Sequence, residues 1–437
     1  MLKNIPMINM RNMINTTNVW SSFPNLNSKA YLTKTLSYVP YFIAGYAITM
    51  ILAVCVLLMV LAYIKHKLMH PFWSSQPVNS RLKFLNQKNG ILNDELPNTK
   101  WLDLNHTIVV SDDVGDIYNT VCRFINDNGS IKCAKSDVQH YLTKHSYPVY
   151  LGIYKKHIQP TEIIESKIPE YDNIAGVITA VPMNFTIFKN NQATNIHNSK
   201  ANLLNYLYYV DNLVVEPEYR KKKIPCKLIT GLHYKVKEIQ TPTLVGLFKR
   251  ENDASPFFNR FTSYTSYWFN IEYWFKKSYA LHPSVKCLKV SHQNLNLFYS
   301  FLVSSCGKYF NCFIYPDISN LIELVEANIY TIYCIMKGDT ICAVYCFKRT
   351  DTDYILVNSV NANRLNDFFI HGFYYCLQEL YNKTRLPNVR IEGLSDCKLI
   401  SDYVLSINSN IRKSVTGWYL YNYKTERQDS QKTFILV

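Results

Sequence analysis

Residues 209 to 235 constrain the fold most strongly, because a strand-like segment, a basic turn and a helix-like segment follow one another there. Residues 209 to 215 (YVDNLVV) are aromatic and β-branched and end just before Pro217, which is typical of a strand. From Ile224 onward, apolar residues recur three or four positions apart, which predicts a helix. The turn between them, residues 220 to 223 (RKKK), therefore places side-chain charge and unpaired backbone amides at a helix N-terminus. This combination suits a pyrophosphate, although a solvated basic surface is the alternative interpretation of the turn taken alone.

The turn resembles the coenzyme A turn of GNAT acyltransferases, R/Q-x-x-G-x-G/A, although residues 220 to 225 (RKKKIP) lack its glycines. It is more similar to one branch of that superfamily, the N-myristoyltransferases, whose run reads approximately L-x-V-H-x-x-L-R-S-K-R-L-A-P-x-L-I. Residues 213 to 229 read LVVEPEYRKKKIPCKLI. The resemblance implies that acyl-CoA is a co-substrate. The coenzyme-binding positions that it implies in this segment are Val214, Val215, Lys221, Lys223, Ile224 and Pro225.

Residues 70 to 78 (HPFWSSQPV) resemble the family's F-W-x-T-Q-P-V element. The sequence predicts an extended aromatic segment that cannot form a helix at its end, because a residue before proline avoids the helical conformation. In the family this element lies beside the coenzyme. The resemblance therefore assigns coenzyme contacts to Pro71, Phe72 and Trp73, with the two aromatic rings closing over the ligand.

The end of the chain also resembles this family. Residues 417 to 423 (GWYLYNY) are similar to Y-Y-L-Y-N-W, and the last four residues (FILV) form an apolar strand-like tail. Family enzymes use the α-carboxylate of their last residue as a base, so the resemblance gives Val437 that role. It likewise gives the backbone amides of Asn212 and Leu213 the role of an oxyanion hole. A frayed, inactive terminus is the alternative for a chain end, but an apolar tail predicts burial.

Two segments depart from the family where it binds the acceptor peptide. Residues 265 to 270 (TSYWFN) resemble T-C-R-Y-W-H-R, which assigns Tyr267 and Phe269 to substrate binding but replaces the family's histidine with phenylalanine. The family's acidic cluster corresponds to residues 126 to 136, which keep one acidic residue and gain two lysines. A preference for basic peptides is therefore in question.

The order of the remaining segments predicts an α+β fold with two tandem GNAT-like units that share a mixed twisted sheet. We expect an acyl-CoA-binding unit at residues 65 to 290 and a second unit, contributing to the peptide site, at residues 291 to 437. The strands expected from aromatic and β-branched runs are residues 101–110, 148–154, 174–187, 244–247, 329–336, 340–347, 354–360 and 389–394. The helices expected from apolar periodicity are residues 113–125, 138–142, 294–303 and 365–381. Residues 189–200 are polar and predict a loop.

The N-terminal region differs in composition from the rest. Residues 1 to 36 are polar, rich in asparagine and without an acidic residue, which predicts a disordered tail. Residues 37 to 64 carry no charge and are long enough for a transmembrane helix, which takes about 20 apolar residues. A buried core helix is the alternative. A small excess of Lys and Arg after the span predicts that the large catalytic part faces the cytoplasm.

The net charge of +15 indicates an anionic partner, which nucleic acid, a membrane surface or a phosphorylated cofactor would satisfy. No nucleic-acid-binding motif accompanies the charge, so no nucleic acid is expected. The 12 cysteines show no C-x-x-C pair and no histidine spacing suited to zinc, so we expect no metal and a reducing compartment.

These observations lead to one hypothesis: a membrane-anchored enzyme, resembling N-myristoyltransferases, that transfers a myristoyl group from myristoyl-CoA to the N-terminal glycine of acceptor proteins, without a permanently bound cofactor. Two alternatives stay open. One is a GNAT acyltransferase with a different acyl chain or amine acceptor. The other is a catalytically silent membrane scaffold that binds acyl-CoA.

Overall fold

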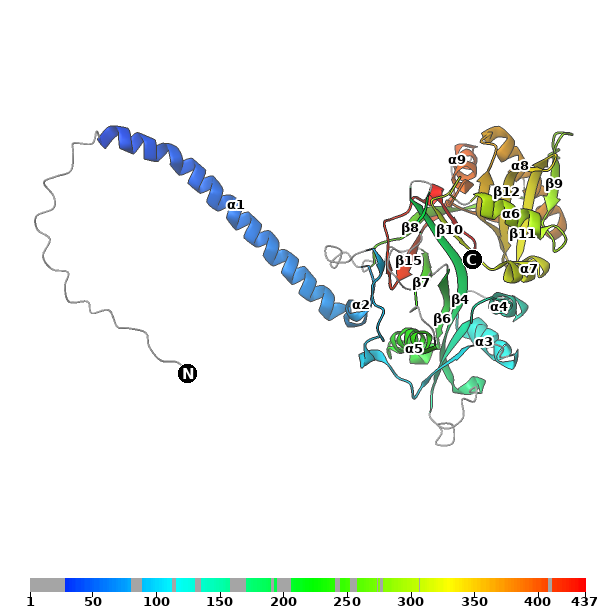
Figure 1. Ribbon diagram of the computed structural model, residues 1–437, viewed down its shortest axis with the longest axis horizontal. Helices are drawn as coiled ribbons and strands as arrows, with labels where there is room; N and C mark the ends of the chain where they lie inside the picture. Colours follow the sequence, from blue (N-terminus) through cyan, green and yellow to red (C-terminus); the bar gives the residue numbers. More distant parts are fainter. Residues whose placement is uncertain are drawn as a thin grey trace, which may run out of the picture. The chain divides into compact units, whose positions relative to one another are not determined.

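The computed structural model describes residues 28–79, 89–111, 115–129, 135–157, 170–189, 192–194, 206–239, 244–251, 258–272, 274–275, 278–305, 307–407 and 411–437 (Figure 1). The chain divides into two compact units, Met1–Pro71 and Phe72–Val437.

The first unit contains one long helix, α1 (Ser28–Met69), which includes the predicted span and extends beyond it at both ends. Residues 28–36 are thus helical, whereas the sequence predicted disorder for them; the rest of that tail, residues 1–27, lies outside the described residues. The part Ile43–Met69 has a mean hydropathy of 2.8, and its described side chains are exposed. Its length and composition suit a membrane span, but a signal sequence has the same features.

The second unit is built on one large mixed sheet. The strands of this unit are β1 (Gly90–Ile91), β2 (Thr107–Ser111), β3 (Tyr150–Lys155), β4 (Ile174–Lys189), β5 (Gln192–Thr194), β6 (Tyr206–Val215), β7 (Gly246–Glu251), β8 (Thr262–Asn270), β9 (Lys286–Lys289), β10 (Cys312–Tyr315), β11 (Tyr330–Lys337), β12 (Thr340–Arg349), β13 (Asp353–Asn361), β14 (Asn388–Glu392), β15 (Arg412–Tyr421), β16 (Tyr423–Lys424) and β17 (Thr433–Ile435). The helices after α1 are α2 (Pro71–Ser75), α3 (Gly115–Asn128), α4 (Lys135–Leu142), α5 (Ile224–Ile239), α6 (Leu295–Ser305), α7 (Ile318–Glu326), α8 (Asn366–Thr384) and α9 (Cys397–Ile407).

The main path of the sheet runs β17-β10-β4-β6-β7-β15-β8-β14-β13-β12-β11-β9, and β2, β3 and β5 join it through β4. The same topology occurs twice. Antiparallel β3, β4 and β6 lead through α5 to β7, which is parallel to β6; antiparallel β11, β12 and β13 lead through α8 to β14, which is parallel to β13. The predicted mixed sheet is therefore confirmed.

The predicted boundary at residues 290 and 291 does not divide this sheet. Strand β8 precedes that boundary in sequence but pairs with β14 and β15, and β15 pairs with β7. Strand β10 follows the boundary but pairs with β4. Each half of the chain thus contributes strands to the other half of the sheet, and residues 72–437 form a single compact unit.

Three buried apolar clusters hold the unit together. The C-terminal strand joins two of them through its alternation, because successive side chains of a strand point to opposite faces. Ile435 and Val437 pack in the first cluster, whereas Phe434 and Leu436 pack in the second. Figure 1 shows the C-terminus inside this unit, near β10, and Leu436 N donates to Ile314 O at 2.9 Å. The predicted burial of the tail is confirmed.

Three local predictions from the sequence are wrong. The predicted loop at residues 189–200 contains strand β5, which pairs with β4. Residues 101–110 do not form one strand, because a 3-10 helix (Thr99–Trp101) precedes β2. The aromatic segment is not extended throughout, since Pro71–Ser75 forms the short helix α2. Proline at the first helical position needs no hydrogen bond and has a suitable φ, which the extended-segment prediction overlooked. The chain becomes extended at Val78, which forms a bridge to Tyr421.

Candidate functional site

Strand β6 contains a break in its pairing with β4. Val177 pairs with Val214 and Thr179 pairs with Asp211, so two residues on β6 oppose one on β4. Asn212, within this bulge, has a left-handed φ of 52°. Asparagine is one of the few residues that adopts this conformation readily, and a bulge locally interrupts the hydrogen-bond ladder.

The bulge lies where β6 loses its other neighbour. Strands β6 and β7 pair only through Tyr208 with Gly246 and Tyr209 with Leu247. Beyond this pair, β7 continues alongside β15, while residues 210–215 of β6 keep β4 as their only strand partner among the described residues. Leu213 is consequently exposed, at 42% of its possible surface, although it lies in the middle of the sheet.

The basic turn follows β6 directly and leads into α5. Lys221 and Lys223 have left-handed φ values of 67° and 62°. Within the described part of the chain, the amides of Lys221, Lys223 and Ile224 donate to no acceptor. Both lysine side chains are exposed. Charge and unpaired amides therefore meet at the N-terminus of α5, as the sequence predicted.

The other two basic residues of the turn are engaged in structural contacts. Arg220 Nε donates to Val215 O at 3.4 Å and its Nη2 donates to Asn128 O at 3.3 Å. Lys222 Nζ stands 4.0 Å from the centroid of the Tyr219 ring, a cation–π contact. Lys223 makes only a longer contact of this kind, so Lys221 and Lys223 are better placed than Arg220 and Lys222 to meet an anion.

The aromatic segment reaches the basic turn through Trp101, which the sequence had not singled out. Phe72 packs edge-on against Trp73 at 4.7 Å and against Trp101 at 5.6 Å between ring centroids. Lys223 Nζ lies 5.4 Å from the Trp101 ring centroid. Phe72 is buried, so its ring packs beneath Trp101 and is not exposed to a ligand. Pro71, at the start of α2, is exposed.

A charged cluster fixes the neighbourhood of Trp101 to α5. Lys227 Nζ donates to Asp103 Oδ2 at 2.7 Å and to the Tyr154 hydroxyl at 2.8 Å. Burial alone would raise the pKa of the Asp103 carboxyl, but hydrogen bonds from Lys227 and His106 outweigh it and lower that pKa to about 2. Asp103 is therefore ionised at neutral pH and holds the first turns of α5 against the segment before β2.

Val437 lies beside two donors from the second half of the sheet. An oxygen of Val437 accepts hydrogen bonds from the Tyr330 hydroxyl and, at 3.3 Å, from Lys348 Nζ. Burial raises the pKa of Tyr330 well above its ordinary value, so the phenol stays protonated and donates. The side chain of Val437 packs against the first apolar cluster, which also contains Leu207 and Tyr208 of β6.

Tyr209 connects this region to the bulge. Its hydroxyl donates to Asp211 Oδ2 at 2.9 Å, and its ring lies 5.8 Å from that of Trp418. Burial raises the pKa of Tyr209 well above its ordinary value, with further contributions from the Asp211 carboxylate and, more weakly, the Tyr141 and Tyr330 phenols. The bulge and the C-terminal strand thus belong to one neighbourhood.

The two residues expected to bind the acceptor peptide lie elsewhere. Phe269 is buried in the third apolar cluster, where its ring is 5.8 Å from that of Trp274. Tyr267 packs against the same cluster and pairs with Ile391. Among the described residues, neither forms a hydrogen bond, ion pair or ring contact with the bulge, the basic turn or Val437, so the structure does not bring them to this site.

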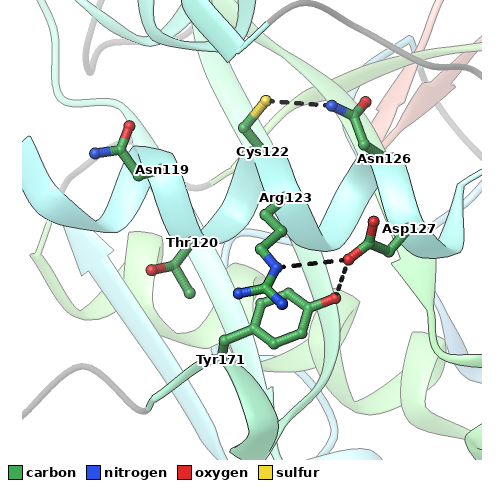
Figure 2. A pocket seen from close by; sticks show the side chains of 7 residues that line it. All are labelled: Asn119, Thr120, Cys122, Arg123, Asn126, Asp127 and Tyr171. Atoms are coloured by element: carbon green, nitrogen blue, oxygen red, sulfur yellow. Dashed lines mark hydrogen bonds and ion pairs between the residues drawn. The ribbon is translucent and has the colours of Figure 1, made fainter.

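The one acidic residue kept from the family's cluster is already paired. Figure 2 shows Asp127 at a surface pocket of about 470 Å³ that α3 and Tyr171 line. Its carboxylate accepts the Tyr171 hydroxyl at 2.5 Å and lies 3.7 Å from Arg123 Nε. Burial, followed by the Asp127 contact, raises the pKa of Tyr171 to about 12. Asp127 thus already has a hydrogen-bond partner and a nearby cation within the chain.

No known protein-family profile matches this sequence, and no curated protein matches it in sequence. Solved structures do match in fold. Saccharomyces cerevisiae N-myristoyltransferase with bound myristoyl-CoA is 12% identical, with a TM-score of 0.58 over 83% of this chain and 90% of the yeast chain. The yeast enzyme with bound myristoyl-CoA and inhibitors is 13% identical, with a TM-score of 0.57 over 83% and 91% of the two chains. The chain therefore has the N-myristoyltransferase fold, as the motifs predicted.

Proposed function

We propose that this protein is an acyltransferase that moves a myristoyl group from myristoyl-CoA to the N-terminal glycine of acceptor proteins. The observation that carries this proposal is the arrangement along β6 and α5. One strand presents a bulge at Asn212, beside the place where β7 separates, and then runs directly into a basic turn whose amides are unpaired. An acyl-CoA bound along this segment would place its thioester at the bulge and its pyrophosphate at the basic turn. The likeness to a fold solved with myristoyl-CoA supports the same reading.

The coenzyme would be held mainly by the turn. Its phosphates would be bound by the amides of Lys221, Lys223 and Ile224 and by the two lysine side chains. Val214 and Val215, the last residues of β6, would contact the coenzyme just before the turn. Pro225 offers no N–H to a phosphate. Phe72 and Trp73 would act through Trp101, by keeping Lys223 in place.

The reaction needs no acyl-enzyme. The acceptor's glycine ammonium loses one proton to the carboxylate of Val437, and the free amine attacks the thioester carbonyl carbon. The carbonyl electron pair moves to oxygen, where the amides of Asn212 and Leu213 stabilise the oxyanion. The attack forms the C–N bond, and collapse of the oxyanion re-forms the C=O bond and breaks the C–S bond. The coenzyme A thiolate leaves, and the second proton of the attacking nitrogen neutralises it.

Acceptors with acidic or neutral segments after glycine suit this chain better than basic ones. Asp127 is paired with Tyr171 and Arg123, and Phe269 is buried. We also propose that α1 anchors the enzyme in a membrane, with residues 72–437 on the cytoplasmic side, and that the repeated topology reflects two GNAT-like units.

The test is transfer of labelled myristate from myristoyl-CoA to peptides with N-terminal glycine, using the full chain in detergent. The peptide panel varies the charge after glycine and includes N-terminal alanine as a control. Transfer to glycine peptides alone is expected, and it should disappear when one glycine is appended after Val437 while acyl-CoA binding persists. Binding without transfer to any peptide would instead support the silent scaffold, and transfer of other acyl chains at equal rates would support a broader acyltransferase.

A further inference from the structure

We infer that the side chains of Thr179 and Asn212 form a bracket that aims the Asn212 amide at the thioester oxygen. They are therefore positioning residues for the oxyanion site. This inference rests on the proposed acyl transfer, but it concerns residues whose side chains have no role in that proposal.

The bracket consists of two hydrogen bonds through one hydroxyl. Thr179 Oγ1 donates to the backbone oxygen of Asp211 at 3.1 Å. The same oxygen accepts from Asn212 Nδ2 at 3.1 Å. Thr179 is 2% exposed, so water does not compete strongly for its hydroxyl. The hydrogen of the Thr179 hydroxyl is thus bonded to Asp211, and its oxygen is bonded to Asn212, the next residue along β6.

The bracket fixes the direction of one peptide plane. The oxygen of Asp211 and the N–H of Asn212 belong to the same peptide unit, which is planar and trans, so the two groups point in opposite directions. Because Thr179 of β4 holds the Asp211 oxygen, the Asn212 N–H must point away from Thr179. On that side β7 has already separated from β6. The amide is therefore directed toward the interval where the thioester is proposed to lie.

The bracket also explains why the bulge holds asparagine. A left-handed φ is adopted most easily by glycine, which would leave the peptide plane free to rotate. Asparagine tolerates φ 52° and adds an amide that ties the bulge to Thr179. An oxyanion site depends on donors fixed before the reaction, because reorientation during the reaction costs part of the stabilisation. Asparagine thus allows the left-handed φ at this position, and its side-chain bond to Thr179 restrains the backbone of the bulge.

The experiment reads the thioester directly. Full-length chain in detergent is loaded with myristoyl-CoA carrying ¹³C at the thioester carbonyl, and the carbonyl stretch is recorded by isotope-edited infrared spectroscopy. A polarised carbonyl absorbs at lower frequency than the free thioester. Four variants are compared with the native chain: Thr179→Val, which removes the hydroxyl; Thr179→Ser, which keeps it; Asn212→Gly, which permits the left-handed angle but removes the side-chain bond to Thr179; and Thr230→Val. Thr230 is also fully buried, and its hydroxyl has no partner among the described residues, so it is the matched control.

The native chain, Thr179→Ser and Thr230→Val should show the lowered frequency, and Thr179→Val and Asn212→Gly should shift it back toward the free value. With an active glycine peptide, Thr179→Val should lower kcat roughly tenfold to a hundredfold with KM for myristoyl-CoA unchanged, because one donor of the oxyanion site is misaimed. If Thr179→Val does not fold, Asn212→Gly gives the same readout.

Among the variants, either of two results would overturn the bracket: a native frequency in both Thr179→Val and Asn212→Gly, or an equal loss in Thr179→Val and Thr230→Val. A native chain that binds myristoyl-CoA without any frequency change would also overturn it. If the native chain does not bind myristoyl-CoA at all, the proposed function is contradicted. The experiment therefore distinguishes failure of the bracket from failure of the proposed function.

Discussion

His233 of α5 and Tyr421 of β15 lie 2.8 Å apart in the interior, measured from Nδ1 to the phenolic oxygen. The Tyr421 hydroxyl donates to Gln76 Oε1 at 2.8 Å, so it accepts from an N–H of the imidazole. This chain of contacts joins the segment after α2 to the helix of the basic turn. His233 is fully buried, and its place in the chain makes the fold sensitive to protonation.

The first prediction follows from the titration of His233. Burial, with the charge of Lys237 adding to it, lowers the pKa of His233 from 6.5 to about 4. In the unfolded chain His233 therefore binds a proton below pH 6.5, whereas in the folded chain it does so only below about pH 4. Stability is full above pH 6.5 and falls through this window by up to roughly 3 kcal/mol.

Urea unfolding of the full chain in detergent at pH 7, 6 and 5 measures this loss. The variant His233→Gln should weaken the pH dependence, whereas His282→Gln, at an exposed histidine, should retain it. An unchanged pH dependence in His233→Gln would contradict the assignment.

Local elements could be predicted from the sequence because the signals that form them are local. The strand and helix on either side of the basic turn occur as predicted, β6 (Tyr206–Val215) and α5 (Ile224–Ile239). The two strands of the hairpin β11–β12 were also predicted, since two apolar runs flank a short turn at Gly338, whose φ of 58° favours glycine. Periodicity and turn chemistry are sufficient for such elements.

Long-range pairings could not be predicted in the same way. No local sequence pattern predicts that β10 pairs with β4. Nor does one predict that β8 pairs with β14 and that β15 pairs with β7. The bulge depends on Thr179, which lies 33 positions before Asn212 in the sequence. Likewise, Phe269 resembles a substrate residue by its place in a motif, yet its neighbours in β14 and the loop at Trp274 bury it.

The second prediction concerns the charge of the basic turn. Lys221→Met and Lys223→Met should each weaken myristoyl-CoA binding about fivefold, or roughly 1 kcal/mol, as exposed ion pairs do, and the difference should shrink at high salt. Lys222→Met is the matched control, because Lys222 is held over Tyr219. Titration calorimetry at two salt concentrations measures the effect. Equal losses for all three lysines would show that the turn acts only as a diffuse charge.

The third prediction separates binding from stability within the same turn. Lys223 holds a left-handed φ of 62°, a conformation that costs an ordinary residue roughly 1–2 kcal/mol. Lys223→Gly should therefore raise the melting temperature while it weakens coenzyme binding. Lys222 does not have a positive φ, so Lys222→Gly relieves no strain and should not raise the melting temperature. A lower melting temperature for Lys223→Gly would refute the strain argument.

The fourth prediction concerns a buried ion network in the middle of the sheet. Lys249 Nζ of β7 lies 2.5 Å from Glu392 Oε1 of β14, and the Tyr264 hydroxyl donates to the same carboxylate at 2.6 Å. Glu392 is 2% exposed. Burial alone would raise the pKa of its carboxyl, but the charges of Lys249 and Arg390 outweigh burial and leave that pKa below its ordinary value of 4.5. Its contribution to stability is therefore present above pH 4.5 and lost as the pH falls below it.

Lys249→Met leaves the buried Glu392 without its nearest cation and should cost roughly 3–5 kcal/mol in urea unfolding at pH 7. Burial should then raise the pKa of the remaining carboxyl above its unfolded value, so the variant should recover part of its stability deficit as the pH falls, whereas the native chain loses stability there. Lys235→Met is the control, because Lys235 pairs with Glu238 at 2.8 Å on the surface, where such pairs contribute less than about 1 kcal/mol. Equal costs for the two variants would mean that Arg390 and Tyr264 suffice to keep Glu392 charged in the interior.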